Sequence, residues 1–143
     1  LLALAIATGL ATHCLGAPAE DATALVKDAA ALISAEGKDK AFAAFNDPAG
    51  KFVKGDLYIF VVDHEGNTLA HGGNAKLVGK NMKDLKDADG RLFMQDMIQK
   101  ARSGGGWVDY KWTNPTTKKV QEKSTLVQPI EGANAFLGCG IYK

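Results

Sequence analysis

The side chains best suited to contact a ligand lie in one strand-like segment, residues 107–113. A strand places alternate side chains on the same face, so Val108, Tyr110 and Trp112 fall together. Tyrosine and tryptophan each combine a flat apolar ring with one polar atom, which suits the wall of a ligand pocket. The same residue types also fill ordinary protein cores, so the pattern leaves both roles open for Tyr110 and Trp112.

Two basic residues are candidates for holding an acid group. Lys123 lies in another strand-like segment, residues 120–129, where a lysine side chain is usually solvated. A lysine that points into a cavity instead can pair with a carboxylate through a charge-assisted hydrogen bond. His71 precedes Gly72 and Gly73. A histidine at such a position is usually a surface residue, but in a pocket its ring N–H can donate to a ligand acid.

The sequence predicts no catalysis, no cofactor and no bound metal. Cys139 lies in the apolar run 135–141 and has no signature of a neighbouring base, so we interpret it as a small buried apolar residue. Asp84, Asp87 and Asp89 lack the bidentate glutamate that closes a calcium loop, and we expect solvated acids or a helix cap there. We therefore predict that the protein is not an enzyme.

The composition is that of a globular domain. The chain has 143 residues, of which 46% are apolar and 23% are charged, a length and a composition that predict one domain. Its formal net charge is +1, with acidic and basic residues interspersed. This distribution argues against nucleic acid as the main partner and against a polybasic membrane patch.

The elements that position the candidate residues follow from the spacing of apolar side chains and from turn residues. The spacing predicts, in order, a helix ending near Gly37, a short helix ending at Asn46, two strands (57–62 and 68–71), a helix (90–102) and three strands (107–113, 120–129 and 135–142). Consecutive strands joined by short turns pair antiparallel. We therefore predict an α+β fold, with an antiparallel five-stranded sheet, a long N-terminal helix and a helix packed on the sheet.

The N-terminal residues differ in composition from the rest of the chain. Residues 1–15 are mostly apolar and carry no formally charged side chain, and residues 17–19 are Ala-Pro-Ala. This pattern predicts a secretory signal peptide over residues 1–19 and a domain over residues 20–143. A transmembrane anchor fits less well, because a spanning helix needs about 20 apolar residues. We expect a periplasmic or secreted protein.

A series of short motifs runs through nearly the whole predicted domain in a fixed order. The motifs are Leu69-Ala70-His71, Leu77-Val78-Gly79-Lys80-Asn81, Asp89-Gly90, the run from Gly106 to Trp112, Asn114-Pro115 and Gly138-Cys139-Gly140-Ile141-Tyr142. In this order they resemble single Cache domains, the PAS-like extracytoplasmic sensor modules of bacterial chemoreceptors and sensor kinases. The resemblance implies a PAS-like sheet with a long N-terminal helix. It also implies a pocket between sheet and loop for small organic acids or similar metabolites.

The chain departs from the family pattern in three ways. Gly72 stands where family members commonly carry proline, which predicts a looser pocket loop. Leu126 stands near a commonly aromatic position, which predicts the loss of one pocket wall. No second membrane helix or output domain occurs within the 143 residues, which, with the signal-like start, predicts a free-standing exported form.

Two functions follow from these observations. The first is a sensor domain for signal transduction or chemotaxis that binds a small carboxylate with His71, Tyr110, Trp112 and Lys123, and that works with a membrane receptor or sensor kinase. The alternative is an exported protein-interaction domain with a vestigial pocket that docks on a partner protein. The first predicts a closed cavity on which Tyr110 and Lys123 converge, and the second predicts a filled cavity with an exposed apolar patch.

Overall fold

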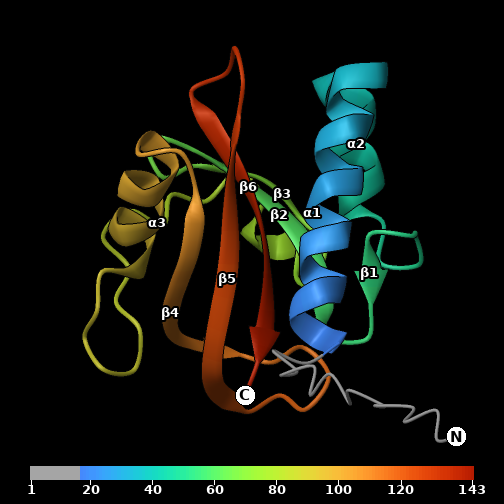
Figure 1. The fold of residues 1–143 in the computed structure, drawn as a ribbon. Helices are drawn as coiled ribbons and strands as arrows, with labels where there is room; N and C mark the ends of the chain where they lie inside the picture. The colour runs from blue at the N-terminus through green and yellow to red at the C-terminus, as the bar shows by residue number, and fades with distance from the viewer. Residues whose placement is uncertain (1–16) are drawn as a thin grey trace, which may run out of the picture.

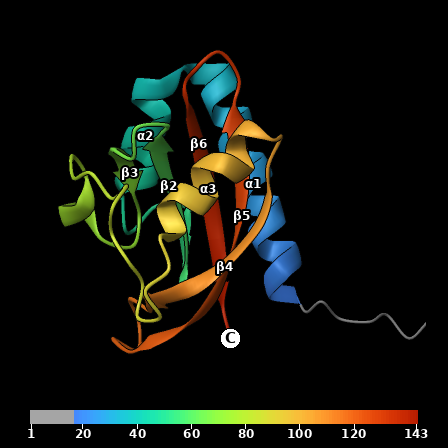
Figure 2. The same cartoon turned by 90° about the vertical axis from the view of Figure 1, so that its left-hand side faces the viewer.

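The computed structural model describes residues 17–143, in which helices cover both faces of a central sheet. Helices α1 (Ala17–Glu36) and α2 (Lys38–Asn46) lie on one face, and α3 (Phe93–Arg102) lies on the other (Figure 1). The view at right angles looks onto α3, which crosses in front of the strands (Figure 2). Of the predicted signal peptide, residues 1–16 lie outside the described part of the chain, and residues 17–19 belong to α1.

The sheet is antiparallel, and its strand order is β1-β2-β6-β5-β4, with β3 paired to β2. The strands are β1 (Val53–Lys54), β2 (Leu57–Asp63), β3 (Thr68–His71), β4 (Gly106–Thr113), β5 (Val120–Ile130) and β6 (Ala135–Tyr142). The five predicted strands are therefore present, and the α+β fold is confirmed. The additional strand β1 has only two residues, too few to show a periodic pattern.

Each face of the sheet carries its own apolar core. Alternate residues of a strand point to opposite faces, so Ile59 and Val61 of β2 join the core beneath α1 and α2. Tyr58, Phe60 and Val62 of the same strand join the core beneath α3. The candidate site belongs to this second core.

Leu126 lies on the opposite face from the candidate site. It packs against the core beneath α1 and α2, whereas its neighbour Val127 belongs to the core beneath α3. The prediction that leucine at this position removes a pocket wall is therefore wrong. Along a strand, a shift of one residue moves a side chain to the opposite face of the sheet, and Leu126 is one residue away from the face of the candidate site.

Gly72 and Gly73 bring the chain after β3 close against Tyr58. A Cβ atom on Gly73 would lie 2.7 Å from Cε1 of the Tyr58 ring, and one on Gly72 would lie 2.9 Å from the carbonyl oxygen of Phe45. The Gly72 N–H donates to the Ile59 carbonyl at 3.0 Å, a bond that proline could not form. This close packing gives no support to the expectation of a looser loop.

Asp87 organises the loop before α3 and does not cap that helix. Its Oδ1 accepts the backbone N–H groups of Asp89 at 3.0 Å and of Arg91 at 2.9 Å, and its Oδ2 accepts that of Lys111 at 3.0 Å. Helix α3 begins at Phe93, later than predicted, and has no side-chain cap. The expectation of an aspartate cap is thus wrong for Asp87, which joins the loop to edge strand β4.

Candidate functional site

A small cavity lies between α3 and the sheet. Its volume is about 10 Å³, close to the least space that holds one water molecule. His71, Tyr110, Trp112 and Lys123 all line it, so the fold brings the four predicted ligand residues together. The other lining residues are Tyr58, Phe60, Val62, Met82, Phe93, Met94 and Met97.

Strand register places Lys123 at the centre of a row of side chains. Tyr110 of β4 stands opposite Lys123 of β5, and Lys123 stands opposite Tyr142 of β6. The Lys123 Nζ atom donates to the Tyr58 hydroxyl at 2.7 Å and lies 4.3 Å from the centre of the Tyr58 ring and 4.8 Å from that of Tyr142. Aromatic faces attract a cation, so these rings partly offset the cost of burying it.

Lys123 has no acidic partner within the described residues. Its exposed fraction is 2%, and no carboxylate in residues 17–143 forms an ion pair with it within 4.0 Å. Burial lowers the pKa of Lys123 to about 7, although Cys139 and Asp56 oppose this shift. A buried cation without a counter-ion is costly, and the cavity beside it is where an anion would relieve that cost.

Two tyrosine hydroxyls connect Lys123 to the end of β4. The Tyr58 and Tyr142 hydroxyls lie 3.2 Å apart, and Tyr142 donates to the Thr113 carbonyl at 3.1 Å. Since a hydroxyl has one hydrogen to donate, Tyr58 is the donor to Tyr142. All the bonds of this chain therefore run in one direction, from Lys123 to Thr113.

His71 is a neutral hydrogen-bond donor. Its Nδ1 accepts the Asn74 backbone N–H at 2.8 Å, so the ring proton is on Nε2. Burial and then the charge of Lys123 lower the pKa of His71 to about 3. Within residues 17–143 the Nε2–H group has no hydrogen-bond acceptor, and it is available to a ligand.

Tyr110 and Trp112 contribute ring surface to the cavity. The Tyr110 hydroxyl is already paired with Thr125 Oγ1 at 2.9 Å. Its ring stacks on Phe93, with centres 4.9 Å apart and planes at 4°, and the Trp112 ring lies 5.2 Å from Phe93. Because Phe93 belongs to α3, this contact fixes the helix over the cavity.

Tyr58 and the methionines were not predicted from the sequence as site residues. Tyr58 falls in a continuous apolar run that predicts only a buried strand, although alternation would have placed it with Phe60 and Val62. All three methionines of the chain, Met82, Met94 and Met97, line the cavity. Methionine side chains are flexible, so this wall can change its shape.

A larger hollow, here named the outer cleft, lies next to the cavity. Its volume is about 570 Å³, and it shares Tyr58, His71 and Trp112 with the cavity. Its other lining residues are Gly73, Asn74, Lys76, Leu77, Thr113, Pro115 and Lys118. The shared rings separate a water-sized inner space from a ligand-sized outer one.

The other side chains with possible chemistry in the described residues are Cys139 and the potential metal ligands. Cys139 is a buried free thiol, as predicted, and burial raises its pKa to about 12. Within residues 17–143 no three histidine, cysteine or acidic side chains are grouped closely enough to hold a metal ion. The described helices also include none with the length and hydropathy needed to span a membrane.

Sequence comparison links the chain to bacterial signalling proteins. Residues 23–143 match the family described as Single Cache domain 2. Sensor histidine kinase MctS of Rhizobium johnstonii is 34% identical over 87 residues, which are 61% of this chain and 19% of that protein. Methyl-accepting chemotaxis protein McpP of Pseudomonas putida is 26% identical over 88 residues, which are 61% of this chain and 16% of that protein. The chain spans less than a fifth of the length of these relatives.

Solved structures show the same fold. A methyl-accepting chemotaxis protein from Vibrio parahaemolyticus matches with a TM-score of 0.76 at 25% identity over 87% of each chain. A Cache chemosensory domain described for carboxylic acid recognition matches in fold, with a TM-score of 0.67 at 24% identity over 86% of each chain. Since the family match covers residues 23–143 and the fold agrees, this chain belongs to the single Cache family of extracytoplasmic sensor domains.

Proposed function

We propose that the protein senses a small carboxylate and performs no catalysis itself. The observation that carries this proposal is Lys123, a buried cation without a carboxylate partner in residues 17–143. A ligand carboxylate would accept a charge-assisted hydrogen bond from Lys123 and a second one from the Nε2–H of His71. Tyr110 and Trp112 would supply the adjoining ring surface.

The ligand must be short, and its binding requires the cavity to enlarge. The present volume of about 10 Å³ does not hold even a two-carbon acid. The polar end is formed by Lys123 and His71, and Met82, Met94 and Met97 lie among the apolar lining. A short apolar tail would displace the flexible Met94 and Met97 side chains. Met82 would keep its place, because its sulfur accepts a hydrogen bond from the buried Thr68 hydroxyl at 3.2 Å.

The alternative function draws support from that small volume. A nearly filled cavity is what an exported protein-interaction domain with a vestigial pocket would show. The buried state of Lys123 favours the sensor function, because a vestigial pocket gains nothing from an unpaired cation that apolar residues could replace with no loss of stability.

A membrane receptor or sensor kinase is the proposed recipient of the signal. Relatives of the chain are a chemotaxis receptor and a sensor kinase, and the family is extracytoplasmic. We therefore propose that the protein acts in the periplasm or outside the cell, and that nucleic acid is not its partner.

A thermal-shift screen of short acids tests the proposed function. A ligand at one hundred times its Kd stabilises the folded state by about 2.7 kcal/mol, so acetate or propionate should raise the Tm by several degrees. Acetamide, which has the shape of acetate without the charge, should not. Lys123→Met should abolish the shift by acids, because it removes the cation and keeps the apolar volume.

The exposed Lys119 provides the matched control. Lys119→Met removes the same charge at an exposed residue that does not line the cavity, and it should preserve the acid shift. If no short acid raises the Tm, or if Lys123→Met responds as the unmodified protein does, the proposed function is wrong.

A further inference from the structure

The outer cleft has the size and the lining of a binding site of its own. Its volume of about 570 Å³ falls within the roughly 300–1,000 Å³ of small-molecule sites. Tyr58, His71 and Trp112 form the wall that it shares with the inner cavity, and Lys76 and Lys118 bring two positive charges. None of the described residues that line it is an aspartate or a glutamate.

A buried asparagine holds Lys118 at one rim of the cleft. Lys118 has a φ of 62° and is the only non-glycine residue of the described chain with a positive φ. Asn114, 2% exposed, accepts the Lys118 N–H with its carbonyl at 2.8 Å. Its side-chain oxygen accepts the Thr116 N–H at 2.9 Å, and its amide donates to Asp56 at 3.1 Å. These hydrogen bonds hold the strained backbone of Lys118 in place. They thereby fix the point from which the Lys118 side chain extends.

Lys76 is positioned by a contact that also reaches His71. It lies in the short 3₁₀ helix η1 (Ala75–Leu77), and the Asn74 side chain accepts its N–H at 3.1 Å. The Asn74 N–H donates in turn to His71 Nδ1. Neither Lys76 nor Lys118 forms an ion pair with a carboxylate of residues 17–143. Two unpaired cations on one hollow favour an anionic occupant.

We propose that the outer cleft is a second ligand site, which binds organic anions that carry a flat ring. The acid group would pair with Lys76 and Lys118, and the ring would stack on Trp112. The inner cavity, at about 10 Å³, has no room for such a ring. Binding in the outer cleft needs neither Lys123 nor the short-acid sensing proposed above.

Benzoate, with the full chain, is the probe that tests this site. Trp112 is one of two tryptophans, and the other, Trp107, does not line the cleft. Benzoate should therefore quench tryptophan emission, and a titration gives its Kd. The double change Lys76→Gln with Lys118→Gln should weaken benzoate binding about tenfold or more, the loss of roughly 1.4 kcal/mol. The same double change should leave the Tm shift by acetate intact, because acetate is assigned to Lys123.

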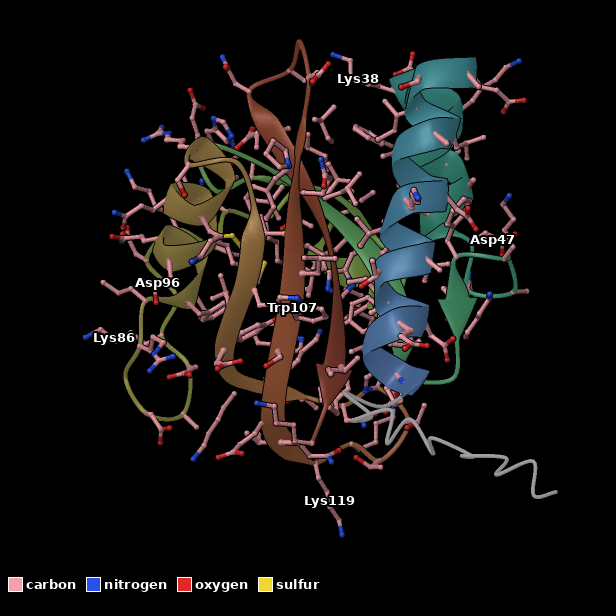
Figure 3. The ribbon with its side chains drawn as sticks, in the orientation of Figure 1. Lys38, Asp47, Lys86, Asp96, Trp107 and Lys119 are labelled. Carbon is pink, nitrogen blue, oxygen red and sulfur yellow. The ribbon has the colours of Figure 1, made fainter. Side chains whose placement is uncertain are left out.

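A charge-matched control separates the cleft from the general surface. Lys80 and Lys119 are exposed and do not line the cleft, and Lys119 points away from the body of the protein (Figure 3). Lys80→Gln with Lys119→Gln should leave the Kd for benzoate unchanged.

Three results would overturn the proposal. The first is the absence of quenching by benzoate, and the second is an equal loss of affinity in the control pair. The third is loss of benzoate binding in Lys123→Met, which would move the ring acid to the inner cavity. Failure of acetate alone to bind would count against the proposed function and would leave the outer site standing.

Discussion

Burying a lysine is costly when no acid group accompanies it, and Lys123 is such a residue. Its ammonium meets one tyrosine hydroxyl and several ring faces, which offset only part of the lost hydration. The neighbouring His71 cannot accept a hydrogen bond from the Lys123 ammonium, because its Nε2–H group is itself a hydrogen-bond donor. The free protein therefore holds an unfavourable charge that an arriving anion would neutralise.

Replacing this lysine should make the ligand-free protein more stable. Lys123→Met keeps an apolar chain of similar length and removes the buried charge, so we expect a gain of about 1–4 kcal/mol at pH 7. Urea unfolding measures this difference. Lys119→Met, at an exposed position, should change the free energy of unfolding by less than about 0.5 kcal/mol. A clear loss of stability in Lys123→Met would show that the lysine is a structural partner of Tyr58.

The gain from Lys123→Met should depend on pH in a definite direction. With a folded-state pKa lowered to about 7, the unfolded chain binds more protons than the folded one above pH 7. Unmodified protein should therefore gain up to about 1.4 kcal/mol per pH unit relative to Lys123→Met between pH 7 and 8.5. Comparing the two proteins at each pH cancels the opposing effects of Cys139 and the buried tyrosines, whose pKa values burial raises. A constant difference over that range would contradict the lowered pKa.

Binding of short acids should weaken as the pH rises through the same range. The acid needs the charged lysine, and about one tenth of Lys123 is charged at pH 8 when its pKa is about 7. Calorimetric titration with acetate should give a Kd about tenfold weaker at pH 8 than at pH 6, and proton uptake at pH 8. Asp56 contributes a nearby carboxylate. The other titratable groups that face Lys123, namely Tyr58, His71, Tyr110, Cys139 and Tyr142, have pKa values shifted out of this range and do not change their charge between these pH values. An unchanged Kd would show that the lysine is already fully charged at pH 8.

At the scale of the elements, the loop before α3 closes the free edge of β4. Asp87 accepts the Lys111 N–H, and Arg91 donates to the Asp109 carbonyl. An unpaired edge strand is a template for pairing with another chain. The two contacts occupy backbone groups that such pairing would use.

Removing the Asp87 carboxylate should release this edge. Asp87→Ala leaves three backbone N–H groups without their acceptor, so we expect a loss of about 1–2 kcal/mol in urea unfolding. Burial tends to raise the pKa of Asp87, but the backbone hydrogen bonds that its carboxylate accepts lower this pKa below its usual value. The Asp87 carboxylate therefore contributes its full stabilisation above about pH 4, and this stabilisation is lost as the pH falls through the lowered pKa. Asp84→Ala, in the same loop, should have little effect. Equal losses of stability in the two variants would show that the negative charge of the loop, and not these hydrogen bonds, stabilises the protein.

Element types were predictable from the sequence, whereas their arrangement was only partly so. Apolar periodicity located β4, β5 and β6 closely, and their short turns gave the pairing of β4 with β5 and of β5 with β6. The position of β6 between β5 and β2 was not predicted, because that pairing joins segments distant in the chain. The start of α3 was placed too early, because the chain from Gly90 to Leu92 is held by loop contacts.

At the scale of the whole molecule, the candidate site is where separate elements meet. His71 comes from β3, Lys123 from β5, Tyr110 and Trp112 from β4, and Phe93 from α3. Alternation along a strand predicted that Tyr110 and Trp112 share a face. The resemblance to single Cache domains predicted that His71 and Lys123 share one pocket. Spacing within one segment could not predict this, because the two residues lie in different strands. Tyr58 was not identified, because a continuous apolar run conceals which of its residues face the cavity.

The methionine lining of the cavity has a practical consequence for spectroscopy. Because the three methionines of the 143-residue sequence all line the cavity, a sample labelled with carbon-13 at the methionine methyl groups would report on this site alone. Chemical shifts would follow the widening of the cavity as an acid enters, and line shapes would give the exchange rate without any engineered reporter.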